Sequence, residues 1–241
     1  MKVKLIAHTQ LSEFFKKQLY YNDAGLQTFS DGQAVALSAI RTCYSHNKPS
    51  EIVELEGKKY FGSAAKDGEG GTEADRLIRH IMRSGHLSTT EHITFTFAIE
   101  GVSRSLLAQL TRHRHFSYSV QSQRYVKLES ASKSKGFDYV TPASIDKHDN
   151  TLDMYTIAME RIQEIYDDLR KNGVPAEDAR YILPNAATCN LVLTGNLRSI
   201  LEFYRKRGEG THSQWEIQNM AEKMKNEVIS VESWTEAFFK E

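Results

Sequence analysis

The strongest constraint on the fold is a segment near the middle of the chain in which large apolar residues alternate with small or polar ones. Ile93, Phe95, Phe97 and Ile99 alternate there with Thr94, Thr96 and Ala98. A period of two places the large side chains on one face, so the pattern predicts a half-buried strand. Residues 2–7 and 187–193 are two further predicted strands.

Most other apolar residues recur at the spacing of a helix. Helices are predicted over residues 11–21, 33–44, 102–114, 152–171, 176–182 and 220–239. Thr72 is expected to cap a helix that ends at Gly85, and Asn196 a helix that ends before Gly208. A hairpin is predicted over residues 53–61. The glycine-rich residues 66–71 lack the Gly-Lys-Ser/Thr ending of a phosphate-binding loop and are predicted to form a flexible loop.

The composition narrows the classes of function. The 241 residues carry 31 basic and 31 acidic side chains, so diffuse attraction to nucleic acid or to membranes is not indicated. Cys43 and Cys189 are too few for a disulfide framework and suit a reducing cytosol. The N-terminal segment is too short and polar for a signal peptide, and no apolar run approaches the length of a membrane span. We therefore expect a soluble cytoplasmic protein without a nucleic-acid or membrane partner.

Residues 112–125 form a candidate anion site. This segment, Arg-His-Arg-His-Phe-Ser-Tyr-Ser-Val-Gln-Ser-Gln-Arg-Tyr, concentrates arginine, histidine, serine and glutamine around a few apolar residues. Unpaired charges are too costly to bury, and the aromatic residues argue against simple exposure. A segment packed on one side that presents arginine to an anion fits both observations, because guanidinium donates paired hydrogen bonds to phosphate. The alternative is that Arg112 to Arg114 only end a helix favourably, which leaves the following residues unexplained.

Arg112, His113 and Arg114, followed after seven residues by Ser122, resemble the signature of flavin-dependent thymidylate synthases. Similar family segments are Gly85 to His92, Arg180 to Pro184, Asn196 to Ser199 and His212 to Ile217. The resemblance implies one α+β domain over residues 1–241, with a central antiparallel sheet flanked by helices. It also implies reductive methylation of dUMP to dTMP, with FAD, 5,10-methylenetetrahydrofolate and NADPH, by a homotetramer whose sites are shared between subunits.

The resemblance also assigns roles to residues. FAD contacts fall on Ser88, Glu91, Arg112, His113, Arg114, Asn196, Arg198 and His212. Contacts to dUMP fall on Gln109, Arg112, Gln121, Ser122, Gln123, Arg124, Arg180 and Arg207. Arg207 is the catalytic residue, because a guanidinium at the uracil edge would stabilise the deprotonated imide and raise electron density at C5. Reduced flavin would deliver the hydride, so no cysteine nucleophile is required and no metal is expected.

Several positions depart from the family pattern. Val120 stands where many relatives have an acidic residue, which leaves a ribose contact to be supplied by another group such as Gln121. Ala108 replaces an arginine, whose role is vacant or passes to Arg104. Arg205 is an alternative to Arg207 for the uracil contact, and Glu202 replaces an asparagine.

Other interpretations compete with these roles. A metal-dependent hydrolase would use the histidines His80, His86, His92, His113 and His115. Their spacing matches no compact metal-binding motif. Glu91 and His92, if they lie on a strand, would also point to opposite faces and could not bind the same ion. A nucleic-acid module would stack bases on Phe116 and Tyr118. Ser122 as a nucleophile lacks an identifiable base. Structural alternatives are an Arg180–Glu177 ion pair, an Arg198–Glu202 ion pair, an N-cap role for Asn196, and a core position for Cys43.

Overall fold

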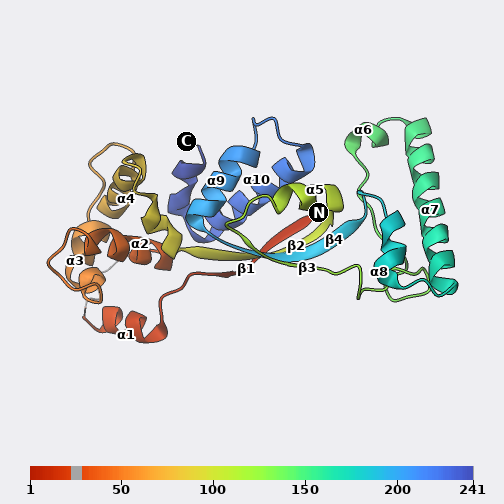
Figure 1. Cartoon of the computed structure of the whole chain (residues 1–241). Coiled ribbons are helices and arrows are strands. Elements are labelled where there is room, and N and C mark those ends of the chain that lie inside the picture. The colour runs from red at the N-terminus through yellow and green to blue at the C-terminus, as the bar shows by residue number, and fades with distance from the viewer. Residues whose placement is uncertain (23–28, 241) are drawn as a thin grey trace. The chain divides into compact units, whose positions relative to one another are not determined.

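The computed structural model describes residues 1–22 and 29–240, which combine helices with a sheet (Figure 1). The strands are β1 (Lys2–His8), β2 (Thr94–Ser103), β3 (Ser117–Val120) and β4 (Thr188–Asn196). The α-helices are α1 (Glu13–Asn22), α2 (Asp31–Thr42), α3 (Ile52–Phe61), α4 (Glu73–Arg83), α5 (Arg104–Leu110), α6 (Ala143–Asp146), α7 (Asp149–Lys171), α8 (Ala176–Ala179), α9 (Leu197–Arg207) and α10 (Trp215–Val231). Short 3-10 helices are η1 (Leu87–His92), η2 (Arg180–Ile182) and η3 (Ser233–Phe239).

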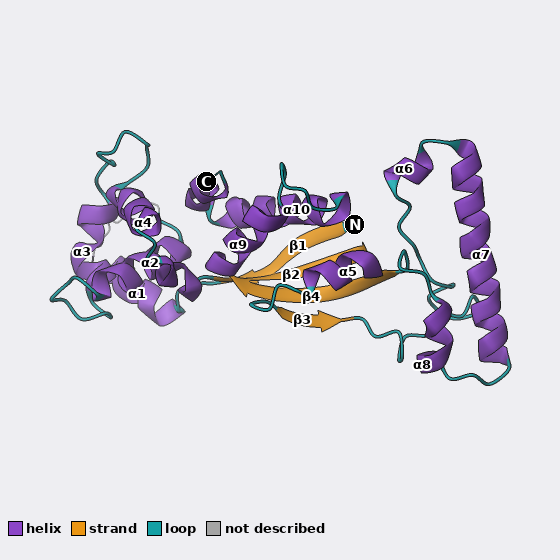
Figure 2. Ribbon diagram, turned by 45° about the horizontal axis from the view of Figure 1, so that its top comes forward, coloured by secondary structure: helices purple, strands orange, loops and turns teal. Residues whose placement is uncertain are grey.

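The strands form one antiparallel sheet in the order β1-β2-β4-β3 (Figure 2). The alternation in β2 is confirmed, because Phe95, Phe97 and Ile99 are fully buried while Thr94 is exposed. Predicted strands at residues 2–7 and 187–193 correspond to β1 and β4. The α+β class with an antiparallel sheet is therefore confirmed.

The chain divides into two compact units, each made of separate chain segments. Unit 1 contains Met1–Val3, Ala98–Leu193 and Gln214–Ile217. Unit 2 contains Lys4–Phe97, Thr194–Ser213 and Gln218–Glu241. The single family domain expected over residues 1–241 stays a prediction.

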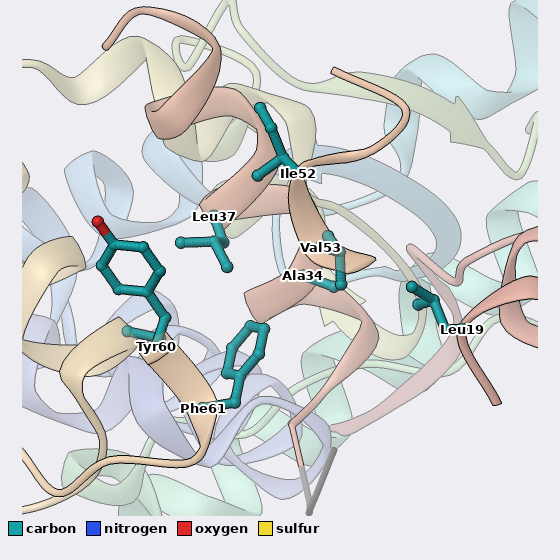
Figure 3. Close-up of a cluster of buried hydrophobic side chains, with 8 residues drawn as sticks. Leu19, Ala34, Leu37, Ile52, Val53, Tyr60 and Phe61 are labelled. Atoms are coloured by element: carbon teal, nitrogen blue, oxygen red, sulfur yellow. The ribbon is translucent and has the colours of Figure 1, made fainter. Parts of the chain in front are cut away.

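A hydrophobic cluster in unit 2 holds α2, α3 and α4 together (Figure 3). Leu37 of α2 and Ile52 and Val53 of α3 are fully buried, and Phe61 stacks on Phe29 with ring centroids 4.3 Å apart. The hairpin predicted over residues 53–61 is wrong, because this segment is helix α3. Its valine and aromatic residues favour strands locally, but the buried positions recur at helical spacing and pack against α2.

The glycine-rich residues 66–71 form a loop, as predicted, and acidic side chains tie it to α4. Arg79 donates to both carboxylate oxygens of Asp67 at 2.9 Å and to the carbonyl of Gly70 at 3.0 Å. Arg83 donates to Glu69 at 2.6 Å. Desolvation raises the pKa of Asp67, but the hydrogen bonds from Arg79 and from the Glu69 amide together outweigh it, so that the pKa lies below its usual value. The predicted cap is confirmed, since Thr72 and Asp75 form a reciprocal capping box at the start of α4.

Two buried carboxylates cap helices from far along the chain. In unit 2, Glu232 accepts hydrogen bonds from the Ser30 hydroxyl, from the Gly32 amide at 3.0 Å and from the Trp234 indole at 2.5 Å. In unit 1, Glu216 accepts from the amide of Ser103 at 2.8 Å and from its hydroxyl at 2.5 Å. The two carboxylates thus fix the first turns of α2 and α5, respectively.

Helix α7 is the longest helix of unit 1, and it lies beside α6 and α8 (Figure 2). It buries Met159 and Tyr166, whereas Met154, Ile157 and Ile165 of its predicted apolar face are exposed in this chain. Among the helices of the described residues, none is long and apolar enough to cross a bilayer.

Candidate functional site

The Arg112–Arg114 segment lies in a turn of unit 1 that follows α5. The predicted helix over residues 102–114 is too long, because α5 spans only Arg104–Leu110 and residues 102–103 belong to β2. Ser103 caps its start by accepting from the Leu106 amide at 3.0 Å. Beyond its end, the Arg112 amide donates to the Gln109 carbonyl at 3.3 Å. Arg112 therefore lies beyond the end of α5, in the turn that follows Gln109 and Leu110.

The guanidinium groups of Arg112 and Arg114 point to solvent. Both residues are exposed, and within residues 1–22 and 29–240 neither side chain makes an ion pair. The neighbouring Phe116 is buried and anchors the turn. This arrangement matches the expectation of a segment packed on one side that presents cations on the other.

The residues after β3 present hydroxyl and amide groups. The Gln121 side-chain oxygen accepts from Asn190 at 3.1 Å, and the Ser122 hydroxyl oxygen accepts from the Arg124 amide at 3.2 Å. The side-chain nitrogen of Gln123 is buried and has no hydrogen-bond partner in the structure. A buried donor without an acceptor costs free energy, which makes Gln123 a candidate ligand contact.

Two predicted dUMP residues meet at Glu177 in unit 1. The Arg124 guanidinium forms an ion pair with the Glu177 carboxylate at 2.8 Å, and the Arg180 Nε donates to the Glu177 carbonyl at 3.0 Å. The alternative of an Arg180–Glu177 carboxylate pair is wrong, because Arg124 occupies that carboxylate. Gln109 is half-buried, and its side-chain amide lies 3.5 Å from the Ser105 carbonyl.

A second group of predicted residues lies in unit 2, where Glu91 and Arg198 form an ion pair. The Arg198 Nη1 donates to Glu91 at 2.6 Å, and its Nε donates to Glu202 at 3.1 Å. These hydrogen bonds to Glu91 and Glu202 raise the pKa of the Arg198 guanidinium. The predicted Arg198–Glu202 pair is confirmed, but the strand expected at Glu91 and His92 is wrong, because both residues belong to η1.

Asn196 and Arg207 lie at opposite ends of α9. The Asn196 side-chain oxygen accepts from the Ser199 amide at 2.9 Å, which confirms its N-cap role. Arg207 is half-buried, and its Nη1 lies 3.5 Å from the Ser213 hydroxyl, whereas Arg205 is exposed. The contact to Ser213 favours Arg207 over Arg205 as the ordered cation at this end.

Ser88 of η1 and His212, in the loop after α9, are both exposed. The loop is itself ordered by contacts within unit 2, since Ser213 donates to the Lys206 carbonyl at 2.9 Å and Gln218 donates to the Thr211 carbonyl at 2.7 Å. His212 is therefore held at a defined place beside the end of α9.

Neither cysteine has the environment of a nucleophile. The core position predicted for Cys43 is wrong, because Cys43 follows the last turn of α2 and is exposed. Cys189 is buried, its thiol lies 3.6 Å from the Val102 carbonyl, and burial raises its pKa. A raised pKa disfavours the thiolate, which is the nucleophilic form. Across the described residues, no group of three histidine, cysteine or carboxylate side chains is placed to hold a metal ion.

A family model described as "Thymidylate synthase complementing protein" matches residues 26–232. The flavin-dependent thymidylate synthase of Clostridium tetani is 40% identical over 215 residues, which cover 83% of this chain and 78% of that protein. The chain belongs to the flavin-dependent thymidylate synthase family. A second member, from Geobacter sulfurreducens, is 36% identical over 199 residues with the same coverage.

Solved structures support the fold of this family member. A UMP/dUMP methylase from Streptomyces cacaoi, bound with 5-Br dUMP, superposes with a TM-score of 0.72 at 22% identity and covers 99% of this chain and 94% of its own. The flavin-dependent thymidylate synthase of Helicobacter pylori, complexed with FAD and dUMP, gives a TM-score of 0.65 at 22% identity and covers 100% and 98%.

The structure adds residues to this flavin-dependent thymidylate synthase that the sequence did not single out. Gln214 accepts from the amides of Glu216 and Ile217 at 3.0 and 3.4 Å and so caps α10. Glu216 in turn holds Ser103 at the start of α5. Part of the family block at residues 212–217 thus has a structural role in unit 1. No sequence signal links Glu216 to Ser103, because 113 positions separate them.

Proposed function

We propose that the chain catalyses the reductive methylation of dUMP to dTMP, with FAD as cofactor, 5,10-methylenetetrahydrofolate as carbon donor and NADPH as reductant. Membership of the flavin-dependent thymidylate synthase family supports this reaction. The structural observation that carries the proposal is the exposed turn on which the Arg112 and Arg114 guanidinium groups lack ion-pair partners in the described chain.

The residues of unit 1 fit phosphate-bearing ligands. FAD and dUMP both carry phosphate, which arginine binds through paired charge-assisted hydrogen bonds. Arg112 and Arg114 supply cations that have no ion-pair partner among the described residues, and His113 between them supplies an imidazole. Arg124 lies at the other end of the segment, close in sequence to the Ser122 hydroxyl and to the side-chain amides of Gln121 and Gln123, which can bind the same ligand.

Four further groups of unit 1 complete the proposed dUMP contacts. The unpaired Gln123 nitrogen supplies a buried donor. Gln121 takes over the ribose contact that Val120 cannot make, because valine has no hydrogen-bonding group. Arg180 and Gln109 add two further polar side chains to the proposed dUMP contacts.

Unit 2 supplies the proposed flavin contacts. Arg198 is held by Glu91 and Glu202, so its remaining donors have a fixed direction. Asn196 keeps its side-chain amide available after its oxygen has capped α9. Ser88 and His212 add exposed polar groups.

Arg207 is the proposed catalytic residue. A guanidinium at the N3/O4 edge of the uracil stabilises negative charge on the imide, and that charge raises electron density at C5, where the new carbon bond forms. When bound, reduced FAD supplies the hydride. A cysteine nucleophile has no part in this scheme, which agrees with the raised pKa of Cys189.

We further propose a homotetramer with sites shared between subunits, located in the cytoplasm. The exposed Met154, Ile157 and Ile165 of α7 support association, because an apolar helix face is costly to leave in water. The exposed thiol of Cys43 suits a reducing compartment. Light scattering on the purified protein should give four times the mass of one chain, and a monomer would exclude the shared-site arrangement.

The decisive experiment is the visible absorption spectrum of the purified protein after FAD has been added and the excess removed. A retained flavin spectrum, followed by NADPH oxidation that depends on dUMP and methylenetetrahydrofolate, is the expected result. A protein that retains no flavin and oxidises no NADPH with all substrates present would overturn the proposal.

A further inference from the structure

Tyr118 joins the two halves of the Arg112–Tyr125 segment. Its hydroxyl lies 2.8 Å from the carbonyl of Leu110 and 2.8 Å from the carbonyl of His113. Carbonyls only accept, so the hydroxyl donates its one proton to this pair. Strand β3, which carries Tyr118, is thereby tied to the end of α5 and to the turn that follows.

The two carbonyls define the shape of that turn. Leu110 is the last residue of α5, and a helix leaves its final carbonyls without internal partners. The Leu110 carbonyl also accepts from the His113 amide at 3.0 Å, and the His113 carbonyl accepts from the Phe116 amide at 3.4 Å. The Tyr118 hydroxyl therefore contacts the last residue of α5 and, within the turn, the residue between Arg112 and Arg114.

Aromatic packing keeps the Tyr118 ring in place independently of its hydroxyl. The ring meets Phe116 edge-on, with centroids 6.2 Å apart and planes at 82°, and Phe116 is buried. Burial raises the pKa of Tyr118 to about 12. The hydroxyl accordingly stays protonated, and remains a donor, throughout the neutral range.

We propose that Tyr118 is a positioning residue whose hydroxyl holds the Arg112 and Arg114 turn in register with the Ser122 and Arg124 end of the segment. This inference rests on the proposed function, since it concerns how the binding segment is pre-organised for FAD and dUMP. Tyr118 does not touch the reacting atoms in this scheme. Its removal should therefore weaken binding more than it slows turnover.

The test compares Tyr118→Phe with Tyr155→Phe. Tyr155 is a matched control, because its hydroxyl also donates to a backbone carbonyl, that of Val140, at 2.8 Å, and burial also raises its pKa. It lies on α7, outside the Arg112–Tyr125 segment. Both variants lose one tyrosine hydroxyl, so a general loss of stability is common to both.

Tyr118→Phe should raise the Kd for FAD, measured by fluorescence quenching, and the KM for dUMP by about three- to tenfold, the effect of one net hydrogen bond. Its kcat at saturating dUMP should stay within about twofold of the wild type. Tyr155→Phe should leave Kd, KM and kcat unchanged. Unchanged Kd and KM in Tyr118→Phe, or the same rise in Tyr155→Phe, would overturn the positioning role.

Hydrogen exchange on the wild-type protein gives a second measurement that needs no variant. A pre-organised turn predicts that the amides of His113 and Phe116 are already protected before FAD and dUMP are added. Protection that arises only after ligand addition would contradict the inference. If the wild type binds neither FAD nor dUMP, the proposed function itself fails, which is a different result from normal binding by Tyr118→Phe.

Discussion

Replacement of Glu232 by glutamine should destabilise unit 2 without creating a cavity. Glu232 is 1% exposed, and its two carboxylate oxygens accept from three donors. One oxygen accepts from the Gly32 amide, and the other from the Ser30 hydroxyl and the Trp234 indole. A glutamine has the same shape but must point its NH2 group at one of these sets. In either orientation an N–H donor of Gly32 or Trp234 faces another donor.

The magnitude follows from the bonds that are lost. A hydrogen bond to a charged group contributes about 1.5–3 kcal/mol, and an unsatisfied buried donor costs about 1–3 kcal/mol. A carboxylate at a helix N-terminus adds about 0.3–1 kcal/mol, here at the first turn of α2. Because these contributions overlap, we expect a loss of about 3 kcal/mol. For a chain of this size that corresponds to a fall in Tm of roughly 6–12 °C.

Thermal unfolding followed by circular dichroism, at one protein concentration and without ligands, measures this loss. The matched control is Glu236→Gln in η3, the 3-10 helix that directly follows Glu232, because Glu236 is exposed and its carboxylate pairs with Lys240 at 2.8 Å. The control should leave Tm unchanged within error. If Glu232→Gln shifted Tm no more than Glu236→Gln does, the carboxylate would not stabilise α2 and the reasoning would be refuted.

Three further predictions concern catalysis, binding and pH. Arg207→Ala should retain FAD but lose about a hundredfold or more in kcat, the effect of removing one electrostatic stabiliser; normal turnover, with loss in Arg205→Ala instead, would transfer the role to Arg205. Ser122→Ala should raise the KM for dUMP about tenfold with turnover still measurable, as expected for one lost hydrogen bond to a phosphate, whereas complete inactivation would indicate a nucleophile. Burial tends to raise the pKa of Glu56, but hydrogen bonds from Ser45, Arg41 and Asn47 outweigh it and lower the pKa below the usual 4.5. Stability from Glu56 is therefore full above pH 4.5 and lost as the pH falls through the lowered pKa, so Glu56→Gln should be less stable than the wild type at pH 7 and equal to it in strong acid; a deficit independent of pH would contradict this.

The sequence correctly predicted the elements in which buried residues recur with a single period, which is two for a strand and 3.6 for a helix. The alternation around Phe95 identified β2, and the capping residues Thr72 and Asn196 marked the starts of α4 and α9. The prediction for residues 53–61 was wrong because Val53 and Tyr60 favour strands locally, whereas the helical spacing of the buried positions fits packing against α2 and α4. Likewise, the last carbonyl of α5 accepts a hydrogen bond from the Tyr118 hydroxyl that no local pattern reveals.

The sequence indicated which residues to include in the candidate site, but it did not indicate which side chains contact one another there. The Arg-His-Arg signature located the exposed cations, because it is a contiguous pattern. As the alternative to substrate binding by Arg180, the sequence offered a pair of Arg180 with Glu177, three positions away, whereas the fold brings Arg124 to that carboxylate. Pairing of Arg198 with Glu91 was equally hidden, since the two residues are 107 positions apart. Such contacts are determined by tertiary structure alone.

The two buried carboxylates also constrain when each unit can finish folding during synthesis of the chain. Ser103 and Ser30 cap α5 and α2 locally, but the amides of Ser103 and Gly32 lack their carboxylate acceptors until Glu216 and Glu232 have been made, the latter 202 positions after Ser30. Neither unit can therefore reach its final state while the ribosome is still translating the first two hundred codons. The cluster around Leu37 and Ile52 does not have to wait for these carboxylates, because all of its members lie between Leu11 and Leu77.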